Sequence, residues 1–265
     1  MLAQWGWGVT VLEEDLVTLE DVYFSYKNSP RQVLQGINLV IRQGDMIGLL
    51  GESGSGKTTL SLVLAGFEQP GSGRVLYKKA DLRQRRVYQE YRSVIQYLFQ
   101  NPRAAVNRFM RVFDLVAEPL VYRKYEQKIR VKLVAETLNM VGLEETRWYD
   151  YPDQLSLGQL QRICLARAMI TRPLMIICDE PFSALDVISR VRMENVIFEL
   201  NEKNSTTFVI ISHEPKTLLK LCQKIMVLQD GRQTDFWRCD QNNILSQYAR
   251  QLLPETTKDF KNICV

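Results

Sequence analysis

The residues Gly51-Glu52-Ser53-Gly54-Ser55-Gly56-Lys57-Thr58 decide the fold of this chain. They match the pattern G-x-x-x-x-G-K-[ST] at every fixed position, after the apolar run 46–50 and before a stretch of helical composition at 58–65 that Gly66 is expected to end. A strand, a glycine-rich loop and a helix in this order form a phosphate-binding loop, or P-loop. In such a loop backbone N–H groups surround phosphate oxygens, Lys57 contacts the outer phosphates, and the Thr58 hydroxyl is a ligand for Mg²⁺.

A second apolar run, at 175–178, ends in the carboxylates Asp179 and Glu180. Open α/β sheets bind ligands at the carboxyl ends of their strands, so we expect these two acids to lie beside the P-loop. Asp179 is suited to hold Mg²⁺ through water, and Glu180 to act as the general base for an attacking water. Paired acids at a strand end are often turn residues, but the P-loop upstream favours nucleotide chemistry.

The rest of the sequence predicts one α/β unit. Imperfect alternation over 16–26 and 33–41, with the turn-like Asn28-Ser29-Pro30 between them, indicates antiparallel strands. A mostly helical insertion is expected between Gln100 and Ile170, with one helix over 129–141 and another that Ser156 caps. The other expected elements are a tight turn at 71–73 before a strand at 74–77, strands at 174–178, 207–211 and 225–228, a helix near 187–200, a turn at 230–231 and an amphipathic helix at 244–253.

Composition and charge exclude several classes of protein. Among 265 residues, 34 basic and 30 acidic side chains give a net charge of +4, which is too small to indicate a nucleic-acid binder. Basic clusters at 78–92 and 123–132 are interpreted as solvated faces or surfaces near anionic lipid headgroups. The five cysteines show no metal-ligand spacing, which fits a reducing compartment. The start lacks a signal-peptide pattern and no run approaches the roughly 18 apolar residues of a membrane-spanning helix, so we expect any membrane association to be peripheral.

A short element between the P-loop and Asp179 resembles the signature motif of ABC ATPases. It reads Leu155-Ser156-Leu157-Gly158-Gln159. The resemblance implies a P-loop NTPase fold with a RecA-like core sheet, an antiparallel β subdomain and an inserted α-helical subdomain at about 100–170, within a domain at 16–235. Residues 1–15 are then an N-terminal extension, and residues 236–265 a C-terminal tail. In this family the signature completes the nucleotide site of a second subunit, and Leu157 departs from the glycine usual there.

The same resemblance assigns roles to residues outside the P-loop. Gln100 matches the glutamine loop, whose side chain reaches Mg²⁺ and the water. His213 matches the switch histidine that contacts the γ-phosphate and helps to hold Glu180. Ser183-Ala184-Leu185-Asp186 resembles the D-loop. The adenine is expected to stack on Tyr26, with Tyr23 or Phe24 as alternatives. The complete set expected to bind nucleotide is Gly51, Glu52, Ser53, Gly54, Ser55, Gly56, Lys57, Thr58, Thr59, Tyr26, Ser156, Gly158, Gln159 and Asp186.

Within the ABC ATPases, three segments resemble the peptide and nickel importer group. They are 99–107, 118–120 and 159–168, and the last is similar to the nickel-type branch, although Arg108 departs from the usual form. The resemblance implies a second ABC ATPase subunit, identical or different, two transmembrane permease subunits and an external substrate-binding protein. The chain would then lie at the cytoplasmic face of a bacterial inner membrane.

Two alternatives remain at this point. A soluble ABC protein acting on nucleic acid or ribosomes commonly carries two cassettes or a long coiled-coil insertion, and neither is present in this sequence. An inactive regulatory subunit would bind nucleotide without hydrolysis, but Glu180 and His213 argue against it.

Overall fold

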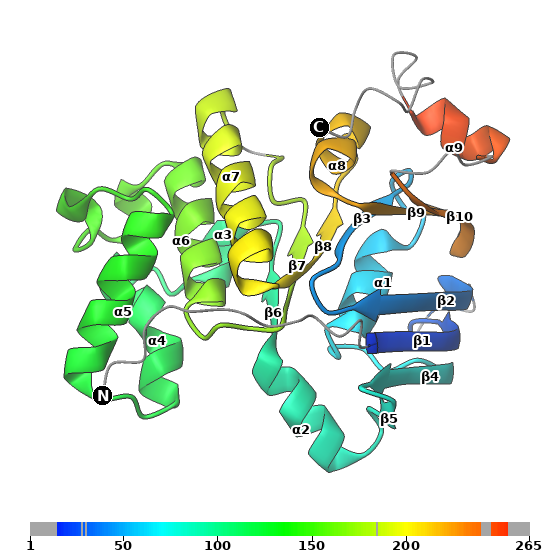
Figure 1. Ribbon diagram of the computed structural model, residues 1–265, viewed down its shortest axis with the longest axis horizontal. Coiled ribbons are helices and arrows are strands. Elements are labelled where there is room, and N and C mark those ends of the chain that lie inside the picture. Colours follow the sequence, from blue (N-terminus) through cyan, green and yellow to red (C-terminus); the bar gives the residue numbers. More distant parts are fainter. Residues whose placement is uncertain (1–14, 28, 30, 184, 240–244, 254–265) are drawn as a thin grey trace.

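The computed structural model describes residues 15–27, 29, 31–183, 185–239 and 245–253, which form two β-sheets and a group of helices (Figure 1). The N-terminal extension at 1–14, Asn28 and Pro30 of the expected turn, Ala184 of the expected D-loop, and most of the C-terminal tail lie outside these residues. Within the described residues, no helix is long and apolar enough to span a membrane.

The first sheet is antiparallel, as the alternating pattern predicted. Val17 of its central strand pairs with Ile41 on one side and with Tyr77 on the other. The turn predicted at 71–73 is shorter, because Ser72 and Gly73 already belong to a strand. The strand order is β2 (Leu34–Arg42), β1 (Asp15–Phe24), β4 (Ser72–Tyr77) and β5 (Ala80–Asp81).

The second sheet has six strands and is parallel except at one edge. Its central strands read as short continuous apolar runs because both of their faces are covered, and every residue of 46–50, 175–179 and 207–211 is buried. The strand order is β10 (Arg232–Arg238), β9 (Lys224–Gln229), β3 (Met46–Leu50), β8 (Thr207–Ile211), β7 (Met175–Asp179) and β6 (Ile95–Leu98).

The helices of the predicted insertion gather at one end of the molecule. Figure 1 shows α4, α5 and α6 beyond β6, whereas the antiparallel sheet lies at the other end. The insertion contains α3 (Pro102–Ala105), α4 (Val112–Tyr122), α5 (Gln127–Met140), the 3₁₀ turns at Glu145–Arg147 and Pro152–Gln154, and α6 (Leu157–Met169). The remaining helices are α1 (Lys57–Leu64), α2 (Arg85–Val94), α7 (Val187–Asn204), α8 (Pro215–Leu221) and α9 (Gln247–Leu252).

Helix ends follow local sequence signals. The predicted stop of α1 at Gly66 is a C-terminal glycine cap, and Gly66 has φ +70°. The N–H groups of Gly66 and Phe67 donate to the carbonyl oxygens of Val63 and Leu62 in the last turn of the helix. Helix α9 is shorter than the predicted 244–253 because Ser246 caps it, and Ile244 lies outside the described residues. Helix α2 was not predicted, since its sequence is polar and Tyr91 is its only fully buried residue.

Two hydrophobic cores meet at the parallel sheet. One joins its face to the helical insertion and α7, and the other packs the antiparallel sheet and α1 against the opposite face. Strand β3 contributes Met46 and Leu50 to the first core, and Ile47 and Leu49 to the second. The P-loop follows directly after β3, so its position is fixed from both sides.

Candidate nucleotide-binding site

The P-loop has a backbone path that requires glycine at two crowded positions. Gly51 has φ +154°, and a Cβ there would lie 2.3 Å from the carbonyl oxygen of Leu228. Gly56 has φ +104° and its Cβ would lie 3.0 Å from the carbonyl oxygen of Val33. The loop is also tied to the β9–β10 turn, because Gly231 N–H donates to the Ser55 carbonyl at 3.0 Å. Close packing of this kind presets the loop before a ligand binds.

Lys57 lies inside the loop, and backbone carbonyls of the loop hold its ammonium group. Its Nζ donates to the carbonyl oxygens of Gly51 at 2.8 Å and Glu52 at 2.7 Å. Burial lowers the pKa of Lys57, while the nearby charges of Glu180 and Asp179 act in the opposite direction. A buried cation whose hydrogen bonds go to two neutral carbonyls favours an anionic ligand in the loop.

Asp179 ends β7 at the mouth of the P-loop. Burial raises the pKa of its carboxyl group, and hydrogen bonds from Tyr97 and Thr58 oppose that rise. The Thr58 hydroxyl and the Asp179 carboxylate are hard oxygen donors, and Gln100 adds an exposed amide just after the neighbouring strand β6. The described residues hold no cluster of three or more His, Cys, Asp or Glu side chains that could hold a metal ion. This donor set fits Mg²⁺, which is usually held by one or two protein oxygens together with phosphates.

Glu180 and His213 meet at the same edge of the sheet. The Nδ1 atom of His213 lies 2.9 Å from Oε2 of Glu180, although the residues are 33 positions apart in sequence. Glu180 has φ +50°, and its N–H donates to the Ile211 carbonyl at 3.1 Å. A non-glycine residue in the left-handed region is strained, and such strain is concentrated at functional sites. Strands β7 and β8 are neighbours, so the pairing of their ends brings the two side chains together.

Tyr26 lies next to the start of α1. Its hydroxyl is 3.1 Å from Oγ1 of Thr59, and its ring meets Phe24 edge-on at 4.9 Å. Tyr26 is 41% exposed and Phe24 is 5% exposed, so of these two rings only that of Tyr26 has a face available for stacking. The hydroxyl of Tyr23, the other alternative, lies close to Gly36 of β2. This geometry favours Tyr26 for adenine stacking.

The signature segment lies away from the P-loop of its own chain. Figure 1 shows α6 and α1 on opposite sides of the parallel strands. Ser156 caps α6, because its Oγ accepts from the Gln159 N–H at 3.2 Å while the Gln159 side chain accepts from the Ser156 N–H at 2.9 Å. Gly158 is buried, and a Cβ there would lie 3.1 Å from Oγ of Ser189.

Asp186 holds the start of α7 beside the signature. Its carboxylate accepts from the N–H and the hydroxyl of Ser189, at 2.9 and 2.7 Å, and these hydrogen bonds lower its pKa. The structure therefore divides the predicted residues into two groups. The P-loop, Asp179, Glu180, His213 and Tyr26 surround one site, whereas Ser156, Gly158, Gln159 and Asp186 form a separate surface.

Two tyrosines at the nucleotide site were missed in the sequence. The Tyr97 hydroxyl donates to Oδ2 of Asp179 at 3.2 Å, and the Tyr248 hydroxyl accepts from the Glu52 N–H at 3.2 Å. The signal for Tyr97 was its polar group within the apolar run just before Gln100. Tyr248 belongs to α9, and nothing in its local sequence indicated a contact with the P-loop.

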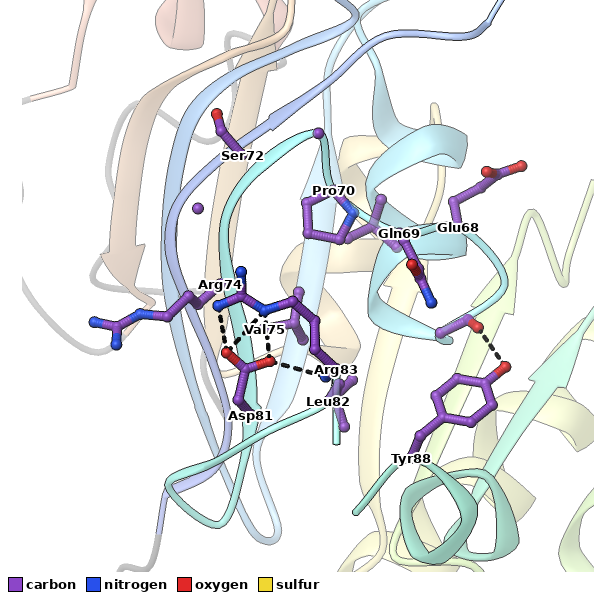
Figure 2. A pocket seen from close by; sticks show the side chains of 14 residues that line it. Glu68, Gln69, Pro70, Ser72, Arg74, Val75, Asp81, Leu82, Arg83 and Tyr88 are labelled. Carbon is purple, nitrogen blue, oxygen red and sulfur yellow. Dashed lines mark hydrogen bonds and ion pairs between the residues drawn. The ribbon is translucent and has the colours of Figure 1, made fainter. Parts of the chain in front are cut away.

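A small cavity of about 70 Å³ lies elsewhere, between the end of α1 and the β4–β5 hairpin (Figure 2). Arg83 neutralises Asp81 at its edge, and Tyr88 donates to the carbonyl of Gly66 at 3.0 Å. None of the residues predicted to bind nucleotide lines this cavity. The P-loop edge of the parallel sheet is therefore the candidate site.

Comparisons with known proteins agree with this geometry. Residues 34–183 match the family model described as ABC transporter. The chain is 34% identical over 202 residues to the oligopeptide transport ATP-binding protein OppF of Lactococcus lactis, a match that covers 75% of this chain and 63% of OppF. It is 34% identical over 215 residues to the nickel import ATP-binding protein NikE of Escherichia coli O157:H7, covering 79% of each.

Solved structures give the same result. A dimeric, post-hydrolysis structure of the ATP-binding cassette MJ0796 with ADP and Pi has a TM-score of 0.77 and 28% identity, covering 84% of this chain and 98% of that one. Other sequence relatives are named for import of sulfate or thiosulfate, methionine, and spermidine or putrescine, so the likeness extends beyond the peptide and nickel group. These matches confirm the predicted class of ATPase. The chain belongs to the ABC transporter family.

Proposed function

We propose that this chain is the ATP-hydrolysing subunit of an ABC importer. The contact between Glu180 and His213, near Lys57 and Asp179, supports the proposal, because a carboxylate base and an imidazole are suited to act on the terminal phosphate of a nucleotide bound in the P-loop. The spread of importers among the relatives supports import in general.

Each part of MgATP has a residue or segment of the site that is suited to bind it. Adenine stacks on Tyr26, and the N–H groups of the P-loop and the start of α1 receive the phosphates. Lys57 exchanges its two carbonyl contacts for phosphate oxygens. Thr58, Asp179 and Gln100 would hold Mg²⁺, which neutralises phosphate charge when bound.

Hydrolysis itself is assigned to the pair at the edge of the sheet. Glu180 accepts a proton from, and orients, the water that attacks the terminal phosphate. His213 holds the Glu180 carboxylate from one side and contacts the phosphate. The contact with His213 restrains the Glu180 side chain, which reduces the freedom lost when the water is positioned.

A second ATPase subunit is needed for a complete site in this proposal. Ser156 and Gly158 lie at the N-terminus of α6, where backbone N–H groups and the helix dipole favour an anion, but α6 lies on the far side of the sheet from α1. A second subunit arranged head to tail would present this surface to the other P-loop, with Asp186 at the junction. The dimeric MJ0796 cassette supports this arrangement.

The cargo and the remaining partners follow from the relatives. We propose uptake of a nickel or other metal chelate, or of a di- or oligopeptide, through two permease subunits with an external binding protein. Names for nickel and oligopeptide transport among the relatives support this choice. The chain would work peripherally, at the cytoplasmic face of the bacterial inner membrane, without a nucleic-acid partner.

The substitution Glu180→Gln tests the central assignment. We expect it to leave ATP affinity within about twofold and to lower turnover by at least about 10²-fold, because the amide cannot accept the proton. Binding and phosphate release are measured on the full chain and on its assembled complex. Glu199→Gln, on the exposed face of α7, is the matched control and should retain both properties. Wild-type turnover in Glu180→Gln would contradict the assignment.

A further inference from the structure

Tyr97 connects three polar groups beneath the nucleotide site. Its hydroxyl lies 3.2 Å from Oδ2 of Asp179 and 2.9 Å from Oγ of Ser61. Ser61 in turn donates to the carbonyl oxygen of Thr58 at 2.7 Å. Tyr97 comes from β6, Asp179 from the neighbouring strand β7, and Ser61 and Thr58 from the helix that follows the P-loop.

The number of hydroxyl protons in this cluster determines which group donates each hydrogen bond. A hydroxyl group has one proton to donate, and Ser61 uses its proton on the Thr58 carbonyl. The Tyr97 proton therefore lies between the Ser61 oxygen, which is neutral, and the Asp179 carboxylate. A charged acceptor forms the stronger hydrogen bond, so the proton is directed mainly at Asp179.

The ring of Tyr97 is held so that the hydroxyl keeps this direction. Phe99 and Phe67 pack against it, with ring centroids 4.6 and 5.6 Å away. The Arg92 guanidinium covers Phe67 from outside at 4.2 Å. Phe67 and Phe99 also contact each other, with centroids 6.0 Å apart, so the three rings form one cluster that restricts rotation of the Tyr97 ring.

We propose that Tyr97 is a positioning residue that orients the Asp179 carboxylate toward Thr58 for metal-bound nucleotide. The inference rests on the proposed function and adds a residue to it. Tyr97 acts through Asp179 and touches neither nucleotide nor metal. Its hydroxyl therefore affects the part of nucleotide affinity that depends on Mg²⁺, and leaves the part that comes from the P-loop and Tyr26 unchanged.

The test compares ATP binding to the full chain with Mg²⁺ and with EDTA. Tyr97→Phe keeps the ring and removes only the hydroxyl. We expect its affinity for ATP with Mg²⁺ to fall about 3- to 12-fold, the scale of one net hydrogen bond, and its affinity in EDTA to stay within about twofold. Tyr88→Phe is the matched control, because it removes a hydroxyl that donates to a backbone carbonyl away from the site, and both affinities should remain as in the wild type (Figure 2).

Ser61→Ala separates positioning from a general loss of structure. Without the Ser61 oxygen, the Tyr97 proton has Asp179 as its acceptor in this cluster, so affinity with Mg²⁺ should equal or exceed that of the wild type. A fall in Ser61→Ala, equal losses with Mg²⁺ and EDTA in Tyr97→Phe, or no loss in that variant would each overturn the proposal. If Tyr97→Phe does not fold, Ser61→Ala still tests the proposal, because an affinity with Mg²⁺ above that of the wild type would support it and a fall would overturn it. Failure of the wild-type chain to bind ATP in either solution would instead overturn the proposed function.

Discussion

At the scale of single residues, the proposed Mg²⁺ ligand Asp179 has a carboxyl group whose burial disfavours its charged form. It is buried at the end of β7, and burial raises the pKa of its carboxyl group above the usual range. Binding of a cation would offset that penalty, whereas the chain without ligand carries it.

The substitution Asp179→Asn should therefore stabilise the chain without ligand at neutral pH. A carboxyl group with a raised pKa in the folded state favours folding when protonated, and this advantage is lost as pH rises through the folded pKa. The variant cannot ionise, so we expect it to exceed the wild type at pH 7 by on the order of 1 kcal/mol in the free energy of unfolding. Denaturant titrations from pH 7 downward test this, and the difference should shrink as the wild-type carboxyl group takes up its proton. A constant difference would contradict it.

Only part of the candidate site could be predicted from the sequence. The P-loop, Asp179, Glu180 and His213 could be named because each follows a recognisable strand or loop, and strand order then brings them to one edge. Tyr97 and Tyr248 could not be named, because their contacts depend on which side chains pack across neighbouring elements. The division of the site between two surfaces came from resemblance to a family and was not implied by any local pattern.

At the scale of elements, the turn between β9 and β10 holds the P-loop in place through backbone hydrogen bonds. Gly231 N–H donates to the Ser55 carbonyl, and the carbonyl of Gly231 accepts from the Gln35 N–H at 2.8 Å. Gly231 has φ +78°, and a Cβ there would lie 2.2 Å from the carbonyl oxygen of Val33. The turn thus joins the P-loop to β2 of the antiparallel sheet.

Gly231→Ala should damage both stability and nucleotide binding. The added Cβ collides with backbone, and the left-handed φ adds strain, so we expect a loss of about 2–4 kcal/mol in the free energy of unfolding. Displacement of the turn should also weaken ATP binding at temperatures where the variant is folded. Gly71→Ala, whose Cβ would meet ordinary packing at 3.7 Å, is the control and should change neither quantity measurably. Wild-type stability in Gly231→Ala would show that the turn can move freely.

Elements were predictable where their hydrophobic pattern was complete. Strands β3, β7, β8 and β9 are apolar runs buried on both faces, and they were found within one or two residues. Helix α2 is polar, with one fully buried side chain, so it has no apolar run of the kind that marks the buried strands. Glycines at 71 and 73 predict a turn at the start of β4, whereas pairing with β1 draws Ser72 and Gly73 into the strand.

At the scale of the whole molecule, α6, which begins at the signature, and α1, which follows the P-loop, lie on opposite sides of the parallel strands (Figure 1). In the proposed assembly, the signature surface of one chain contacts the phosphate bound by the other chain, and the P-loop binds the chain's own nucleotide. ATP affinity of the isolated chain should therefore depend on the P-loop, whereas turnover should also depend on the signature surface of the other subunit.

Ser156→Asp tests this separation. Aspartate caps a helix as well as serine does, so α6 should keep its stability, but the new charge would repel a terminal phosphate. We expect ATP affinity of the isolated chain to stay within about twofold, while turnover at high protein concentration falls at least about 10²-fold. Ser156→Asn, a neutral cap of similar size, should retain much more turnover. Equal turnover of the two variants, or lost ATP binding in Ser156→Asp, would contradict a role in a second subunit's site.

His213 is the only histidine in the sequence. Growth on ¹⁵N-histidine would therefore introduce one labelled imidazole into the whole chain, and its NMR signals need no assignment. Its Nδ1 atom lies 2.9 Å from Oε2 of Glu180, so the two nitrogen shifts report the tautomer of the ring and its hydrogen bond with Glu180. Purification with an affinity tag that contains no histidine keeps this label unique. The effect of each added ligand can then be followed in the ¹⁵N shifts of the His213 ring alone.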